Sequence, residues 1–183
     1  PSATLYVTLE PCCHKGKTDP CTDLIIKNKF HRVVIGSMDP NPLAGGGARI
    51  LKENNIQVDE GICNNEIRSI NKRFLTFYEK KRPYIILKMA CTLDGYIAEP
   101  NGHSKWITNS ASRASVHKLR SSCDAILVGR KTIEKDNPSL TSHGKGKDPR
   151  VILVDSNSKL NTNFNVFRNN PIIFTKDQLV DDP

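Results

Sequence analysis

The sequence has no long hydrophobic run, and this excludes a transmembrane helix. No stretch of the 183 residues approaches the ~18 consecutive apolar residues that a membrane-spanning helix requires. Aromatic residues are few, at 6%, and there is no long block of one charge and no low-complexity tract. The scarcity of aromatics argues against a surface on which nucleic-acid bases stack, and the mixed composition argues against a disordered chain.

Cysteine is too scarce for a disulfide-stabilised scaffold, because the chain has only six cysteines. No apolar secretory segment precedes them, so we expect reduced thiols and a cytoplasmic protein. The hydrophobic fraction of 37% allows a core of modest size. The net charge of +8 is compatible with nucleic acid, with a phosphorylated substrate, or with no charged partner.

Apolar patterns predict strands that alternate with helices, which is typical of an α/β fold with largely parallel sheets. The expected strands are 4–9, 32–36, 56–59, 84–90, 124–128, 150–154 and 172–175. The expected helices are 22–29, 48–54, 65–79, 110–121 and 130–135. The segment Lys80-Lys-Arg-Pro83 reads as a linker, which predicts one domain over 1–80 and a second over 84–183.

The chain opens inside a predicted strand and does not begin with methionine. Its other end, Asp181-Asp182-Pro183, follows the last strand-like run, Ile172 to Thr175. We therefore expect a piece of a longer protein, in which the first domain lacks its N-terminal part and the second lacks its C-terminal part.

Three thiols and an imidazole lie within ten residues, at Cys12, Cys13, His14 and Cys21. Zinc prefers such ligands, and a catalytic zinc ion needs three of them with a water molecule. A proline precedes both Cys12 and Cys21, so each can begin a helix, where the thiolate is favoured. Two other interpretations stay open: buried cysteines on a core loop, and a structural zinc site made by all four residues.

Leu9-Glu10-Pro11-Cys12, followed by Pro20-Cys21, resembles the second zinc half-motif of the cytidine-deaminase-like family. The longer spacing here, with Gly16 and Thr18 inside it, looks like the pyrimidine deaminase of riboflavin biosynthesis. The resemblance implies that Cys12 and Cys21 bind Zn²⁺ and that Cys13 does not. It also implies that Asp39 and Asn41 contact the pyrimidine, while His14 and Lys17 hold the ribose phosphate.

The sequence departs from this family at one decisive point, because no H-x-E motif occurs. That motif supplies the third zinc ligand and the glutamate that moves protons. Glu10 matches the glutamate at the strand end, not the proton carrier. We therefore expect no deamination unless another segment supplies the missing ligand and glutamate.

A second series of motifs follows the linker: Lys88-Met-Ala90, Asp94-Gly95, Ser104-Lys-Trp106, Asp124 to Gly129, Asp136-Asn-Pro138 and Pro149 to Asp155. In this order they resemble the reductase of the riboflavin pathway, a dihydrofolate-reductase-like domain that uses NADPH. The two domains are fused in the same order in the bifunctional bacterial enzymes. The resemblance thus implies part of a three-layer deaminase-like domain followed by part of a reductase-like domain.

The resemblance assigns roles to single residues of the second domain. NADPH contacts fall on Ala90, Trp106, Thr132, Asp136 and Ser156, and substrate contacts fall on Lys88, Ser104, Arg120 and Leu140. Asp136 is the candidate catalytic residue that manages a proton during hydride transfer. His143 stands where the family often carries arginine, so phosphate binding there is expected to be weaker or pH-dependent.

The sequence therefore predicts a zinc-dependent deamination of a diaminopyrimidine ribosylamine phosphate, followed by reduction of its ribose to ribitol by NADPH. The expected partner is a small phosphorylated pyrimidine, with no nucleic acid and no membrane, and a homo-oligomer when the protein is complete. Three alternatives stay open: a reductase with a degenerate deaminase domain, a nucleobase deaminase acting on RNA, and a non-enzymatic zinc or nucleic-acid module.

Overall fold

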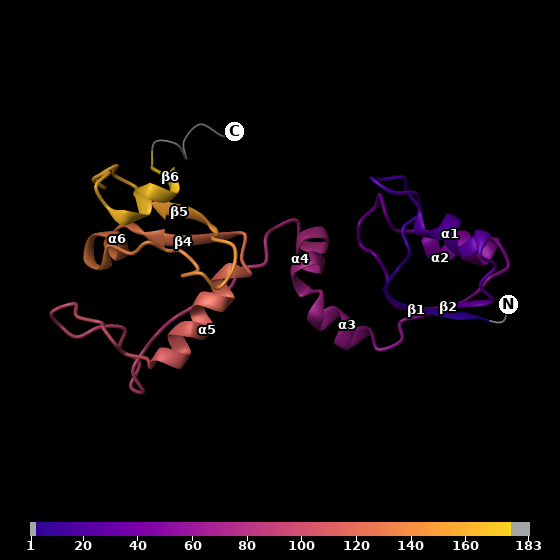
Figure 1. Ribbon diagram of the computed structural model, residues 1–183, viewed down its shortest axis with the longest axis horizontal. Helices are drawn as coiled ribbons and strands as arrows, with labels where there is room; N and C mark the ends of the chain where they lie inside the picture. Colours follow the sequence, from indigo (N-terminus) through magenta and orange to yellow (C-terminus); the bar gives the residue numbers. More distant parts are fainter. Residues whose placement is uncertain (1–2, 177–183) are drawn as a thin grey trace. The chain divides into compact units, whose positions relative to one another are not determined.

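The computed structural model describes residues 3–176, and these divide after residue 87 into two compact units, 3–87 and 88–176 (Figure 1). Each unit is built around a three-stranded parallel sheet. The prediction of a mixed α/β fold with parallel sheets is confirmed. Within the described residues no helix is long and apolar enough to cross a membrane.

The first unit has the strand order β1-β2-β3, with β1 at Thr4–Leu9, β2 at Arg32–Ser37 and β3 at Gln57–Glu60. Helices α1 (Cys21–Lys27) and α2 (Gly47–Glu53) connect the strands. Val33 and Ile35 of the central strand are fully buried and pack against Ile25 of α1 and Leu51 of α2. This apolar layer fixes the register of the sheet, because alternate residues of β2 face it.

The other face of β2 is contacted by helix α3 (Asn64–Ile70). A Cβ atom added to Gly36 would overlap Cδ1 of Ile67 and lie 3.1 Å from the carbonyl oxygen of Thr8, so a larger residue here would push the Ile67 side chain aside. Helix α4 (Lys72–Lys80) follows directly. The single helix predicted over 65–79 is wrong, because Asn71 ends α3 and begins α4. Asparagine is a weak helix former that favours such boundaries.

The second unit has the strand order β4-β5-β6, with β4 at Ala125–Gly129, β5 at Arg150–Val154 and β6 at Ile172–Phe174. Helix α5 (Ser110–Ser121) precedes β4, helix α6 (Arg130–Asp136) links β4 to β5, and a 3₁₀ helix (Asn165–Asn169) precedes β6. Ile133 of α6 packs in one buried cluster with Val151 and Leu153 of β5.

The strand predicted over 84–90 is wrong, because this segment is not part of a sheet in the structure. Ile85, Leu87 and Met89 are 71%, 82% and 64% exposed, so the apolar residues of this segment form no buried face. A strand forms only when its backbone groups find a neighbouring strand, and no described strand pairs with this segment.

Candidate functional site

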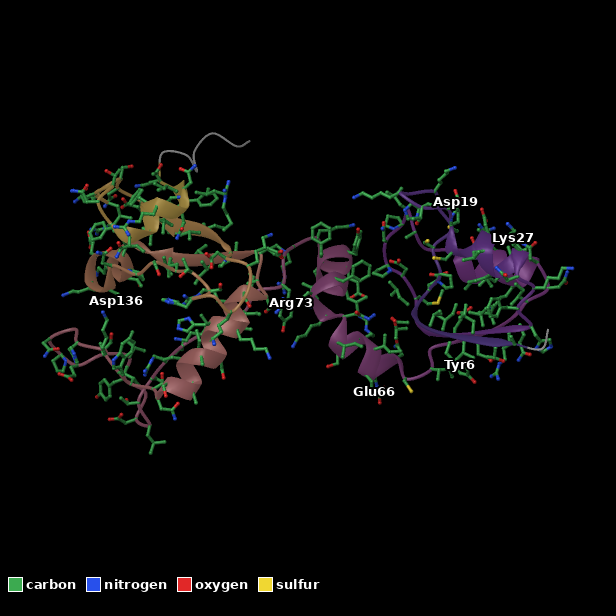
Figure 2. The ribbon with its side chains drawn as sticks, in the orientation of Figure 1. Tyr6, Asp19, Lys27, Glu66, Arg73 and Asp136 are labelled. Carbon is green, nitrogen blue, oxygen red and sulfur yellow. The ribbon has the colours of Figure 1, made fainter. Side chains whose placement is uncertain are left out.

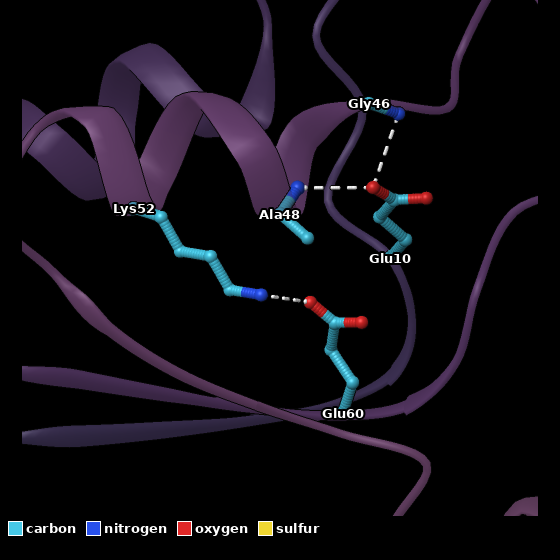
Figure 3. A network of polar contacts seen from close by, with 5 residues as sticks. All are labelled: Glu10, Gly46, Ala48, Lys52 and Glu60. Atoms are coloured by element: carbon cyan, nitrogen blue, oxygen red, sulfur yellow. Dashed lines mark hydrogen bonds and ion pairs between the residues drawn. The ribbon is translucent and has the colours of Figure 1, made fainter.

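Glu10 follows the carboxyl end of β1, and its side chain binds the loop between β2 and α2 by hydrogen bonds. Its side chain is only 4% exposed, and its Oε1 accepts hydrogen bonds from the N–H groups of Gly46 (3.0 Å) and Ala48 (2.9 Å) (Figure 3). Its Oε2 accepts a bond from the N–H of Asp39 at 3.2 Å. Figure 3 also shows the ion pair of Lys52 with Glu60, at 2.6 Å. Glu10 thus has a structural role, as its place in the motif predicts.

The loop held by Glu10 carries the two predicted pyrimidine contacts. Asp39 Oδ1 accepts the N–H of Asn41 at 2.8 Å, and Asn41 Oδ1 accepts the N–H of Leu43 at 3.1 Å. Asp39 also lines a cavity of about 440 Å³ that lies beyond the carboxyl ends of β2 and β3. Parallel sheets commonly bind ligands at this end. Asn41 is not among the residues that line the cavity.

The structure brings Cys12 and Cys21 together and separates Cys13 from them. The N–H of Cys21 donates to Cys12 Sγ at 3.5 Å, whereas Cys13 Sγ donates to the carbonyl of Gly45 at 3.1 Å. The hydrogen bond with the Cys12 thiol, with burial and the Cys12 charge as smaller causes, raises the pKa of the Cys21 thiol. His14 and Lys17 lie exposed in the segment between β1 and α1.

Two neighbouring thiols fit the donor set of zinc, but they are fewer than the three protein ligands of a catalytic site. Among the described residues no group of three His, Cys, Asp or Glu side chains could hold a metal ion. The four-ligand structural zinc site is therefore not supported.

A cavity of about 340 Å³ lies beyond the carboxyl ends of β4 and β5 in the second unit. Thr132 and Ser156, two of the predicted NADPH contacts, both line it. Arg130 and Lys131 also line it, and neither was predicted as a contact from the sequence. Their position at the start of α6, directly after β4, was the available signal, since helix starts at strand ends favour phosphates.

Arg130 is held in place at this cavity by two carboxylates. Its guanidinium pairs with Glu134 at 2.6 Å and with Asp155 at 3.6 Å. The Asp155 side chain is 2% exposed, and its Oδ2 also accepts the N–H of Leu160 at 2.7 Å. A cation fixed in this way can face an anionic ligand without first being ordered.

The other predicted contacts of the reductase lie outside this cavity. Trp106 is 70% exposed, and the guanidinium of Arg113 lies 4.2 Å from its ring centroid. Asp136 is the last residue of α6 and is exposed (Figure 2). Lys88 is exposed, whereas Ala90 and Ser104 are half-buried. A Cβ atom at Gly102 would lie 3.5 Å from Lys135 Nζ, so the loop before Trp106 approaches this end of α6.

One face of α5 is basic. Arg113, His117 and Arg120 are spaced four and three residues apart, which places them on the same side of the helix. Arg120 Nη1 donates to the carbonyl of Thr141 at 2.6 Å, next to the buried Leu140. The structure thus brings together two predicted substrate contacts, Arg120 and Leu140. Arg113 and His117 were not predicted as site residues, although their helical spacing could be read from the sequence.

His117 packs against His143, with ring centroids 4.2 Å apart. Burial is the largest cause that lowers the pKa of His117, followed by the charges of His143 and Arg120. Burial also lowers the pKa of Arg120, and Asp148 acts in the opposite direction. Among the described residues, His117 Nδ1 and Arg120 Nε are buried without a hydrogen-bond partner. Arg113, Arg120 and Lys145 thus surround this pair of histidines with positive charge.

Comparison with known proteins now decides the family. The family model described as the RibD C-terminal domain matches residues 83–182. The chain belongs to the RibD family of riboflavin biosynthesis proteins. It is 49% identical over 156 residues to the riboflavin biosynthesis protein RibD of Aquifex aeolicus, an alignment that covers 84% of this chain and 44% of that protein. The Escherichia coli RibD is 44% identical over 140 residues, covering 76% and 38%.

Solved structures of the family agree with this assignment. The Thermotoga maritima protein described as a diaminohydroxyphosphoribosylaminopyrimidine deaminase/5-amino-6-(5-phosphoribosylamino)uracil reductase is 45% identical. Its TM-score is 0.89, and the match covers 100% of this chain and 53% of that one. Acinetobacter baumannii RibD gives a TM-score of 0.83 at 36% identity, covering 95% and 51%. The chain thus spans about half the length of the relatives that it matches.

Proposed function

We propose that the second unit is the NADPH-dependent reductase part of a bifunctional riboflavin biosynthesis enzyme. Its substrate is a phosphorylated ribosylamino-pyrimidine, whose ribose is reduced to ribitol. The observation that carries this proposal is the basic face of α5, where Arg120 is bonded to Thr141 beside the predicted substrate contact Leu140. A phosphorylated small molecule needs such a fixed cationic surface.

The cavity beyond β4 and β5 fits a nucleotide cofactor. Arg130 and Lys131 would face its phosphates, and the Thr132 and Ser156 hydroxyls would donate hydrogen bonds to them. NADPH supplies a hydride when it is bound. The residues of this chain would bind and orient the two ligands. Trp106 offers an exposed ring beside Arg113, and Asp136, exposed at the end of α6, would exchange a proton with the substrate.

Replacing Arg130 by glutamine is expected to weaken NADPH binding about tenfold, because a charge-assisted contact is worth about 1.5–3 kcal/mol. The dissociation constant is measured by titration calorimetry. Lys159, which is exposed and does not line the cavity, supplies the matched control K159Q, for which we expect no change. Equal affinities of the R130Q and wild-type proteins would remove Arg130 from the cofactor site.

We further propose that Cys12 and Cys21 are two ligands of the catalytic zinc ion of the deaminase, with Asp39 at its substrate cavity. The neighbouring thiols support this, and Cys13 is turned to Gly45 instead. Zinc would activate a water molecule for attack on the pyrimidine. The third ligand and the proton-moving glutamate would come from a segment outside this sequence.

Cobalt binding tests the two ligands directly. In a protein that also carries the segment with the third ligand, Co²⁺ in place of zinc is expected to give a thiolate charge-transfer absorption band that is lost in both C12S and C21S. The control C13S is expected to keep the band, because Cys13 Sγ bonds to Gly45. A band that survives in C12S and vanishes in C13S would show that Cys13, and not Cys12, is a ligand, and would contradict the proposed assignment.

The alternative of a reductase with a degenerate deaminase domain is favoured by one observation, the pair of thiols without a third ligand among the described residues. Cobalt binding distinguishes an intact zinc site from a degenerate one. A degenerate site would give no charge-transfer band in the wild-type protein or in any variant. A nucleobase deaminase acting on RNA is less well supported, because the basic face of α5 lies in the second unit. The homo-oligomer stays a prediction.

An NADPH oxidation assay tests the reductase proposal. The oxidation is monitored as a loss of NADPH absorbance in the near ultraviolet. We expect oxidation that depends on the deaminated, phosphorylated ribosylamino-pyrimidine. Failure to oxidise NADPH with this substrate, in a protein that carries both domains, would overturn the proposal.

A further inference from the structure

Arg113 stands at a position of α5 where a cation does not stabilise the helix. Helix α5 begins at Ser110, so Arg113 is its fourth residue, and no acidic residue lies in the first turn. A positive charge near a helix N-terminus is unfavourable, because it faces the positive end of the helix dipole. Within residues 3–176 no carboxylate forms an ion pair with Arg113. The charge of Arg113 therefore serves something other than the helix itself.

The guanidinium of Arg113 makes two contacts with the segment that precedes α5. Its Nη1 donates to the carbonyl of Thr108 at 2.6 Å, and its Cζ lies 4.2 Å from the centroid of the Trp106 ring. Arg120, on the same face of α5, donates instead to the carbonyl of Thr141. The two arginines thus hold two different segments, and Arg113 holds the one that carries Trp106.

The ring of Trp106 has little other support. Its side chain is 70% exposed. Among the described residues, it belongs neither to the core cluster of the second unit nor to the apolar residues packed against that cluster. A cation over the face of an indole attracts its electron-rich ring, and the attraction depends on how the ring is turned. Arg113 therefore determines the orientation of an exposed ring that has room for a second planar group.

We propose that Arg113 is a positioning residue of the cofactor site, which holds the Trp106 ring ready to stack on a planar ring of NADPH. This inference rests on the proposed function, in which Trp106 contacts the cofactor. Arg113 acts only through Trp106 and the Thr108 carbonyl. A ring that is fixed before binding loses less conformational freedom when the cofactor arrives, so the cofactor binds more tightly.

The planar guanidinium is suited to making both contacts at once. It stacks on an aromatic face while its N–H groups donate in its own plane. Lysine keeps the charge as a compact ammonium group, so R113K is expected to keep part of the effect. Leucine forms helices about as well as arginine but has neither charge nor donor, so R113L is expected to lose both contacts.

The first measurement needs no cofactor, because Trp106 is the only tryptophan of the chain. Its fluorescence anisotropy is recorded on the full chain. We expect a fall in anisotropy in R113L, because the ring is released, and an intermediate value in R113K. The matched control is K118L, since Lys118 is exposed and lies on another side of α5. Its anisotropy is expected to equal that of the wild type, and thermal unfolding establishes that each variant is folded.

The second measurement is a double-mutant cycle on the dissociation constant of NADPH, determined by titration calorimetry. R113L is expected to raise this constant about fivefold. In a W106L background the same substitution is expected to raise it by less than about twofold, because the ring through which Arg113 acts is already absent. A merely structural role of Arg113 would give the same factor in both backgrounds.

Wild-type NADPH affinity in R113L, or effects of R113L and W106L that are independent of each other, would overturn the positioning role. The reductase proposal would then stand, because the wild-type protein still binds and oxidises NADPH. A wild-type protein that binds no NADPH would overturn the proposed function and the positioning role together. The two failures are distinguishable, since the first is seen only in the variants and the second is seen in the wild type.

Discussion

Replacing Glu10 by alanine is expected to lower the free energy of unfolding of the first unit by about 3 kcal/mol. The substitution leaves three backbone N–H groups without an acceptor, those of Asp39, Gly46 and Ala48. The Glu10 side chain is buried, so water cannot easily replace the lost oxygens. Urea unfolding followed by far-ultraviolet circular dichroism measures the change.

Two further variants give this measurement its controls. E10Q is expected to lie between the wild type and E10A, because its amide keeps one acceptor oxygen but turns an NH₂ group toward a donor. E53A removes the carboxylate of an exposed pair, Arg49 with Glu53 at 3.1 Å, and is expected to change stability by less than about 0.5 kcal/mol. Equal stability of E10A and E53A would show that Glu10 does not hold the loop.

Replacing Arg120 by glutamine is expected to lower kcat/KM of the reductase about 100-fold. Its guanidinium is itself a predicted substrate contact, and Nη1 is positioned by the Thr141 carbonyl. Loss of a charge-assisted contact to a phosphate costs about 1.5–3 kcal/mol, and most of the effect is expected in KM. Steady-state NADPH oxidation over a range of substrate concentrations separates KM from kcat.

The control for Arg120 is R168Q, since Arg168 is exposed on the 3₁₀ helix and lines neither cavity. R168Q is expected to keep the wild-type kcat/KM within about twofold. Thermal unfolding of R120Q checks that the lost bond to Thr141 has not unfolded the loop. A folded R120Q protein with wild-type KM would place the substrate phosphate elsewhere.

Local patterns were sufficient for most of the fold. Val33 and Ile35 lie in a continuous apolar run that only a buried strand explains, and the alternation of strands with helices predicts parallel pairing. The prediction of a strand over 84–90 was wrong for a reason that lies outside the segment itself. Its apolar residues match a strand, but backbone pairing depends on a neighbour that the local pattern does not specify.

The candidate sites were predictable only in part. Cys12 and Cys21 were assigned by resemblance, and their contact in space depends on the turn that brings α1 back to the end of β1. Arg130 was missed because its role depends on the cavity that two strand ends create. His117 was missed because its partner, His143, is distant in the sequence and becomes a neighbour only after folding.

The most direct test of the reductase proposal uses the single tryptophan of the chain, Trp106. Its fluorescence is recorded while NADPH is added to the protein. We expect saturable quenching of Trp106, with energy transfer to the nicotinamide ring, because the proposed cofactor site lies within the same unit. Trp106 emission that stays constant up to millimolar NADPH would contradict the assignment of this unit as an NADPH-dependent reductase.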